Sequence, residues 1–377
     1  MPYQVYLMTG SSLAVAWLGI VQAVPIVAAG LYGGSLADHF DRRRVMIGCQ
    51  ALMAVTSLLL VGAAIGSRGP LWLIYLATAA SAGLSTVEHA ARSAVVPRLV
   101  GLDRLPVALT LNQGLFPIAA VAGPALAGLV LASAGLPVAY GLDVGCFALA
   151  LTALWQLGPQ HPEAPTPSRG WRAPFEGLRY VARSQILIGI FTVDLAAMIF
   201  GMPRALFPAL ATGLFHVGAG GLGLLYAAPA AGALLGAAFL GGVARLRRQG
   251  LAVILAVGAW GLAIALFGLS GRSFSLGLGF LALAGLADMV SSIFRHTLLQ
   301  STVPDRLRGR LSAFNAMVIT TGPRLGDLEA GAVAAVTSVQ FSVVSGGLAS
   351  AVGAVVVALL IPGLRSQRAG PVSSEAG

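Results

Sequence analysis

Charged side chains are scarce in this chain, and lysine is absent. Only 10% of its 377 residues are charged, 57% are hydrophobic, and the mean hydropathy is +0.86. Soluble domains carry roughly 25% charged residues, so this chain lacks the charge to cover a water-exposed surface. Its repeated apolar runs, each about 20 residues long, match helices that cross a bilayer core. The composition therefore predicts an all-α polytopic membrane protein.

Features that would indicate other chemistry are also missing. No GxxxxGK[ST] loop is present, which argues against ATP-driven transport. The two cysteines, Cys49 and Cys146, lie inside apolar runs and indicate free buried thiols rather than a disulfide or metal site. The net charge of +10 comes from short arginine clusters between apolar runs, which does not suggest a nucleic-acid partner. We expect no enzyme activity, no metal and no cofactor.

Charge clusters and Gly/Pro turns divide the chain into 11 predicted transmembrane helices, five before a polar stretch and six after it. An N-terminal bundle, 1–158, contains the spans 13–37, 45–66, 71–91, 106–132 and 137–157. A C-terminal six-helix bundle, 186–363, contains the spans 186–210, 217–243, 250–270, 273–294, 311–336 and 340–362. Between them, 159–185 is predicted to be a cytoplasmic linker with an amphipathic helix. The final residues, 364–377, are predicted to be a disordered cytoplasmic tail.

The arginines orient these spans. If the loop with Arg42, Arg43 and Arg44 is cytoplasmic, alternation places 19 of the 23 arginines on the cytoplasmic side. Arg68, Arg204 and Arg272 fall outside, and one arginine falls within a span. Such an excess is the positive-inside signal of a multi-pass protein of a bacterial-type cell (plasma) membrane. The C-terminus is predicted to be cytoplasmic.

The loop that orients the chain also has a family resemblance. The sequence "GGSLADHFDRRR" is similar to the Gly-x-Leu-Ala-Asp-Arg-x-Gly-Arg-Lys-like signature of the major facilitator superfamily, except that His39 and Asp41 replace the usual Arg and Gly. Its form resembles the drug- and siderophore-exporter branch that includes the enterobactin exporters. The resemblance implies a two-bundle fold and a gating motif that latches the cytoplasmic gate, formed by Gly34, Asp38, Arg42 and Arg43.

Two further patterns support that resemblance. The segments 95–112 and 301–315 share Val-Pro, Asp-Arg-Leu and a closing Asn, which indicates two related halves arranged in parallel. A glycine-rich segment resembles the antiporter motif of the family's exporters, in Gly114, Gly123, Pro124 and Gly128. Pro124 removes a backbone hydrogen bond, and the glycines permit close helix packing. Generic packing of small residues is the alternative explanation.

Charged residues within the spans are functional candidates, because each costs about 2.5–3.5 kcal/mol at bilayer depth. Glu88 and Arg92, four residues apart, are expected to form a structural ion pair. Candidate proton or substrate sites are Asp194, near mid-depth, Asp288, near the cytoplasmic end of its span, and the cluster Arg324, Asp327 and Glu329. Arg324 can neutralise Asp327, but Glu329 lies about 200° round the helix from Asp327. Both acids therefore cannot easily share Arg324, and one of the two is expected to titrate. The span 71–91 lacks the mid-membrane arginine that many proton-coupled exporters of this superfamily carry, which counts against proton coupling.

The sequence and the family resemblance thus predict a secondary-active, proton-coupled transporter that exports small amphipathic, drug- or siderophore-like molecules by alternating access. We expect a monomer in the lipid bilayer. A truncated non-transporting protein or sensor, and a small-molecule importer, are the alternatives. The resemblance also implies that the first transmembrane helix of the family is missing, since only one span precedes the gating motif. The start "MPYQVYLMTGSS" resembles the end of that helix.

Overall fold

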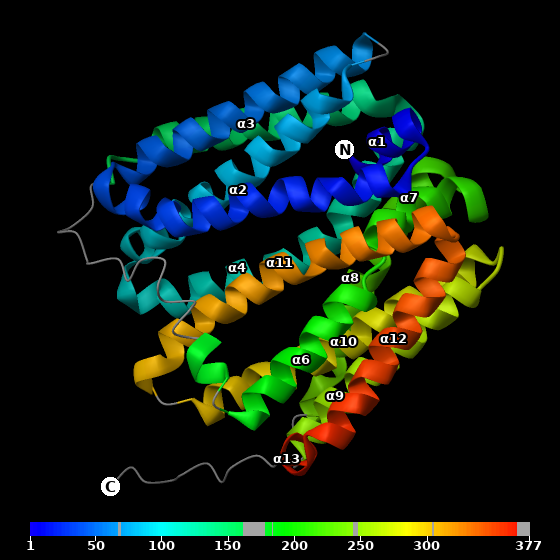
Figure 1. Cartoon of the computed structure of the whole chain (residues 1–377). Coiled ribbons are helices and arrows are strands. Elements are labelled where there is room, and N and C mark those ends of the chain that lie inside the picture. The colour runs from blue at the N-terminus through cyan, green and yellow to red at the C-terminus, as the bar shows by residue number, and fades with distance from the viewer. Residues whose placement is uncertain (67–68, 161–177, 183, 244–247, 304, 368–377) are drawn as a thin grey trace, which may run out of the picture. The chain divides into compact units, whose positions relative to one another are not determined.

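The computed structural model describes residues 1–66, 69–160, 178–182, 184–243, 248–303 and 305–367, and all regular elements in these ranges are helical. The side chains of 31–39, 102, 113, 239–243, 305–310, 313 and 366 lie outside that description. The chain forms two compact units (Figure 1). Unit 1 comprises Met1–Trp171 and Phe207–Leu224, and unit 2 comprises Arg172–Leu206 and Leu225–Gly377.

Unit 1 is built around α4 (Leu71–Gln156), against which α2 (Ser12–His39) and α3 (Arg42–Ile65) pack, with the short α1 (Pro2–Thr9) beside them. Two glycines divide α4, because Gly101 and Gly135 have φ angles of 71° and 77°. A residue with a side chain rarely adopts this left-handed region, so glycine allows the chain to turn there without strain. The resulting three helical stretches correspond to the predicted spans 71–91, 106–132 and 137–157.

Unit 2 contains α6 (Gln185–Phe200), α9 (Gln249–Leu269), α10 (Phe274–Thr302), α11 (Asp305–Val336), α12 (Val339–Leu360) and α13 (Pro362–Ser366). Its helices approach one another closely where glycines meet. Gly261 of α9 lies against the backbone of Gly347 in α12, which a Cβ at either position would obstruct. Between helices in lipid, such small residues allow close van der Waals packing. Phe191 and Phe314 add an edge-to-face contact with ring centroids 4.9 Å apart.

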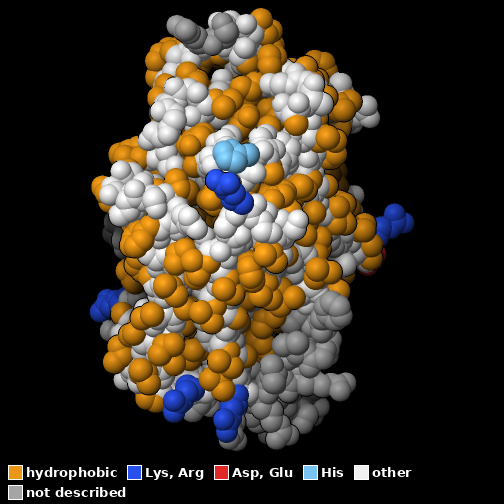
Figure 2. All heavy atoms as spheres, turned by 90° about the vertical axis from the view of Figure 1, so that its right-hand side faces the viewer, with side chains coloured by type: hydrophobic (Ala, Val, Ile, Leu, Met, Phe, Trp, Pro, Cys, Tyr) orange, Lys and Arg blue, Asp and Glu red, His pale blue; other side chains and the backbone are white. Residues whose placement is uncertain are grey.

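The number of spans depends on how the long helices are counted. Nine helices of the described residues are long and apolar enough to cross a membrane. One of these, Asp103–Gln156, contains two predicted spans that meet at Gly135, and α11 is excluded because Arg324, Asp327 and Glu329 interrupt its apolar sequence. Counting Asp103–Gln156 as two spans and adding α11 gives the eleven predicted spans. Hydrophobic side chains cover most of the face in Figure 2, as lipid contact requires.

Three predicted boundaries differ from the structure. The helix α10 continues to Thr302 rather than 294, so Asp288 lies at the middle of the helix. The predicted disordered tail, 364–377, begins inside α13, where Leu364 is fully buried against α9. Residues 207–224 cluster with unit 1 and not with the predicted C-terminal bundle. Most of the predicted linker helix lies outside the described residues.

Candidate functional site

The gating motif lies where α2 ends and α3 begins. The side chain of Asp38 and the surroundings of Gly34 lie outside the description, whereas the side chains of the arginines that follow are described. Asp41 is the N-cap of α3, and its carboxylate accepts a hydrogen bond from the Arg43 backbone N–H at 3.0 Å. The first N–H groups of a helix lack intrahelical partners, and aspartate is among the side chains that satisfy them best. Asp41 therefore fixes the start of α3.

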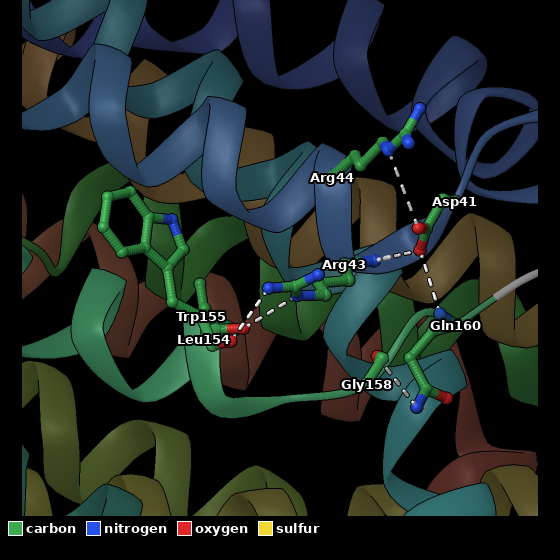
Figure 3. Close-up of polar contacts among 7 residues, drawn as sticks. All are labelled: Asp41, Arg43, Arg44, Leu154, Trp155, Gly158 and Gln160. Atoms are coloured by element: carbon green, nitrogen blue, oxygen red, sulfur yellow. Dashed lines mark hydrogen bonds and ion pairs between the residues drawn. The ribbon is translucent and has the colours of Figure 1, made fainter.

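Asp41 also holds the segment that follows α4. Its Oδ1 accepts a second hydrogen bond, from the Gln160 backbone N–H at 3.0 Å (Figure 3). The Arg42 backbone N–H donates to the Gln160 carbonyl at 3.2 Å. Arg44 Nε lies 3.9 Å from the carboxylate, on a side chain that is 85% exposed. The start of the predicted linker is thus hydrogen-bonded to the loop that bears the gating motif.

Arg43 extends this connection to the end of α4. Its guanidinium donates to the carbonyls of Leu154 at 3.1 Å and Trp155 at 2.8 Å (Figure 3). These carbonyls belong to the last turn of the helix, where acceptors lack intrahelical partners and a cation is favoured by the helix dipole. Arg42 Nη1 donates to the Ala94 carbonyl at 3.4 Å. Two arginines of the motif therefore tie together segments of unit 1 that are distant in sequence.

Sequence reasoning treated Asp41 only as a departure from the family pattern. Its position immediately before an arginine-rich helix is an N-cap signal that could have revealed its first contact. Its second contact could not be found in this way, because Gln160 lies 119 residues further along the chain.

The antiporter-like motif divides into two kinds of position. Gly128 of α4 packs against Gly223 at the start of α8 (Gly218–Val243), and a Cβ at Gly128 would lie 2.7 Å from the Gly223 Cα. Gly223 in turn lies against the Pro124 carbonyl. A Cβ at Gly114 or Gly123 would meet nothing within 4 Å. Close approach therefore requires Gly128, whereas the other two glycines leave open space around them.

The charged side chains of α4 form the expected local pair. Arg92 Nε lies 3.7 Å from Glu88 Oε1, and the glutamate side chain is only 11% exposed. Arg92 Nη2 also lies 3.4 Å from Nδ1 of His89. This arrangement neutralises a largely buried acid one turn away, as the four-residue spacing indicates.

In unit 2, Asp194 has a partner that lies 101 residues away. The Arg295 guanidinium of α10 forms an ion pair with Asp194 of α6, and its other terminal nitrogen lies 4.0 Å from Asp288 Oδ1. The side chains of Arg295 and Asp194 are 10% and 5% exposed, whereas that of Asp288 is 41% exposed. The structure thus brings two of the candidate acids to one arginine that the sequence analysis did not select.

The remaining candidates lie on α11. Asp327 accepts a hydrogen bond from the Ala205 backbone N–H at 2.9 Å, where the chain resumes helical structure beyond the end of α6. The Arg324 guanidinium instead donates to the Thr320 carbonyl, one turn earlier in its own helix. No ion pair within 4.0 Å joins Arg324 to Asp327 in the structure as described. Glu329 is half-buried.

An open pocket of about 680 Å³ lies in unit 2 between α10 and α11. Five of its ten lining residues are leucine, valine, alanine or isoleucine, and five are polar: His296, Gln300, Ser312, Asn315 and Thr320. Such a mixed lining suits an amphipathic molecule, because it supplies both apolar contact and hydrogen bonds. Among the described residues, no three His, Cys, Asp or Glu side chains are placed to hold a metal ion.

Comparisons with known proteins identify the family. A family model of the major facilitator superfamily, described as a transmembrane secretion effector, matches residues 4–373. This chain belongs to the major facilitator superfamily. Membership in this secretion family makes it a multi-pass membrane protein and a secondary transporter that exports small molecules.

Two curated relatives of this superfamily member are enterobactin exporters. The chain is 29% identical over 371 residues to enterobactin exporter EntS of Shigella boydii serotype 18 and to that of Escherichia coli O139:H28, covering 98% of this chain and 88% of each relative. Among solved structures, a mutant of the nucleoside transporter NupG aligns with a TM-score of 0.72 at 15% identity, over 96% of this chain and 94% of that chain. A bacterial homologue of the iron transporter ferroportin, in an inward-facing state, aligns with a TM-score of 0.68 at 15% identity, over 97% and 93% of the two chains.

Proposed function

We propose that this transporter exports amphipathic, siderophore- or drug-like molecules by alternating access, with protons entering in exchange. The observation that supports this most strongly is the similarity to the enterobactin exporters, which extends over 98% of the chain. The pocket of unit 2, which polar and apolar residues line together, is compatible with a substrate that carries hydrogen-bonding groups on an apolar frame. A sensor or a nutrient importer receives no comparable support, because the family is one of secretion effectors.

Inside-out vesicles from bacteria that express the protein would test this proposal, with enterobactin as the probe. Energised vesicles should accumulate the probe, and a protonophore should abolish the accumulation because it removes the proton gradient. Vesicles from cells without the protein provide the control. Accumulation that persists with the protonophore would contradict proton coupling, and an absence of accumulation would contradict a siderophore of this kind as substrate.

We further propose that Asp38 and Arg42 latch the cytoplasmic gate, as the resemblance to the family implies. The contacts of Arg42 with Ala94 and Gln160 support this, because they show that the motif fixes the loop in unit 1. Replacing Asp38 with Asn should reduce turnover more than substrate binding, since a latch acts on conformational exchange. Asp103→Asn, a change of an exposed acid, is the matched control. Unchanged transport in the Asp38 variant would refute the latch.

The proposal also includes the membrane in which the protein lies, the side of its C-terminus and its oligomeric state. A bacterial exporter family suggests the inner membrane, and the arginine distribution supports a cytoplasmic C-terminus. We propose a monomeric transporter, because each of the two units buries its own packed helices.

A further inference from the structure

Arg295 joins two acids from different parts of unit 2. One terminal nitrogen forms the ion pair with Asp194 on α6, and the other lies 4.0 Å from Asp288, which is two turns earlier on the same helix. Arg295 and Asp194 are almost covered by protein, whereas Asp288 remains 41% exposed. The pair with Asp194 is therefore close and buried, and the contact with Asp288 is loose and accessible.

The charges in this cluster do not balance. Two carboxylates share one guanidinium, which leaves one negative charge without a partner inside a membrane-spanning bundle. Removing such a charge from water is unfavourable unless a counter-charge or a proton neutralises it. An acid in this position is expected to take up a proton more readily than an acid in water.

Neighbouring charged groups do not neutralise the excess negative charge of this cluster. Arg204, beyond the end of α6, acts electrostatically on both Asp288 and Asp327. In the part of α11 whose side chains the structure describes, Arg324 and Glu329 add one charge of each sign beside Asp327. These seven side chains therefore still carry one more acid than arginine. His296 is the next residue after Arg295, Tyr226 is the titratable group on α8, and α9 and α12 carry no titratable side chain.

We propose that Asp288 binds the proton that drives export, and that Arg295 transmits its binding and release to the pocket. This inference rests on the proposed proton-coupled export and names the site where coupling occurs. With a proton on Asp288, only Asp194 would attract the guanidinium, and the closer of the two contacts in the structure is the one with Asp194. When the proton passes from the Asp288 carboxyl to water, the new carboxylate competes for Arg295 and draws it from Asp194.

The pocket lies close enough to respond to such a movement. Asp194 and Arg295 line a small cavity of about 10 Å³ together with His296 and Asn315. That cavity is about the size that one water molecule requires. His296 and Asn315 also line the 680 Å³ pocket, so one layer of side chains separates it from the ion pair. A displaced Arg295 would change the position of this shared wall. Arg295 is thus a positioning residue rather than a residue that contacts the substrate.

Infrared titration of the full-length protein in lipid nanodiscs would test the proton site. The wild type should show a protonated-carboxyl band that disappears as the pH rises, and Asp288→Asn should eliminate it. Asp327→Asn is the matched control and should leave the Asp288 component of the band in place, because it changes a carboxyl that is bonded to the Ala205 backbone N–H and lies outside the Arg295 cluster. A nearby cation favours the carboxylate, so Arg295→Gln should raise the pH at which the band disappears by about one unit. Arg295→Lys keeps a cation and should return this pH to the wild-type value. A band unaffected by Asp288→Asn would overturn the assignment.

Labelling of a cysteine in the shared wall would test transmission to the pocket. With Cys49 and Cys146 replaced by alanine, Asn315→Cys should react with a thiol reagent at a rate that depends on pH. Asp288→Asn should remove that dependence, whereas Ser312→Cys, which lines only the larger pocket, should show little dependence in either background. An Asn315→Cys rate that does not change with pH would overturn the role of Arg295.

These experiments distinguish a failure of proton-driven export from a failure of the proton site at Asp288. If Asp288→Asn eliminates the band but export resists a protonophore, the proton site stands and proton-driven export is wrong. If export collapses with the protonophore but Asp288→Asn keeps both the band and the pH-dependent labelling, the coupling stands and its assignment to Asp288 is wrong.

Discussion

Arg43 contributes more to stability than its neighbour Arg44, because the two side chains have different acceptors. Arg43 donates two hydrogen bonds to the final carbonyls of α4, whereas Arg44 has one long contact from a largely exposed side chain. Replacing Arg43 with Gln should lower the free energy of unfolding by about 1–3 kcal/mol, and Arg44→Gln by about 1 kcal/mol or less. Thermal unfolding of the two detergent-solubilised variants would measure this, and equal midpoints would contradict it.

Asp327 is expected to act as an acceptor and not as a proton carrier. Its carboxylate satisfies the backbone N–H of Ala205, and an amide oxygen can do the same. Asp327→Asn should therefore preserve stability and proton-dependent export. Asp327→Ala should destabilise the protein by about 1–3 kcal/mol, because a donor loses its partner. Export by both variants in inside-out vesicles, with unfolding midpoints beside it, provides the measurement. Loss of proton dependence in Asp327→Asn would show that the acid itself titrates.

Local spacing predicts contacts only when the partners lie on one helix. The Glu88–Arg92 pair follows from a separation of four residues, and the structure contains it. Asp194 was expected to lie near mid-depth with no close partner in sequence, and its partner is Arg295 on another helix. Asp41 likewise reaches Gln160 only because α4 returns to the loop. Such contacts depend on tertiary packing, which a single sequence does not specify.

At the scale of elements, Gly128 is the glycine of the antiporter-like motif that allows α4 and α8 to approach closely. A Val side chain there would overlap the backbone at Gly223 and Ala219, and overpacking of this kind costs about 1–3 kcal/mol or more. Gly128→Val should therefore reduce both the yield of folded protein and the export rate. The same change at Gly123 is the control, because its Cβ would meet open space. Size-exclusion chromatography and vesicle transport would compare them, and equal behaviour would contradict a close approach at Gly128.

The existence of the spans could be predicted from the sequence, but their ends could not. Apolar length alone identifies a span, because the bilayer core requires about 20 residues. Helices also continue beyond that core, as α10 does to Thr302 and α11 does from Asp305. Asp288, predicted near the cytoplasmic end of its span, therefore lies at the middle of the longer helix α10. The functional interpretation of an acid therefore depended on a boundary that hydropathy does not define.

At the scale of the whole molecule, the arginine distribution makes a topology prediction that is independent of any side-chain contact. The two ends of α9 should lie on opposite sides of the membrane, because 245–248 contains three arginines whereas Gly271 lies in a short turn with one. Alkaline phosphatase, which is active only outside the cytoplasm, should be active when fused after Gly271 and inactive when fused after Arg248. Green fluorescent protein fused after Gly377 should fluoresce. The opposite pattern would invert every span, place the gating motif outside the cell, and remove the basis for a cytoplasmic latch at Asp38.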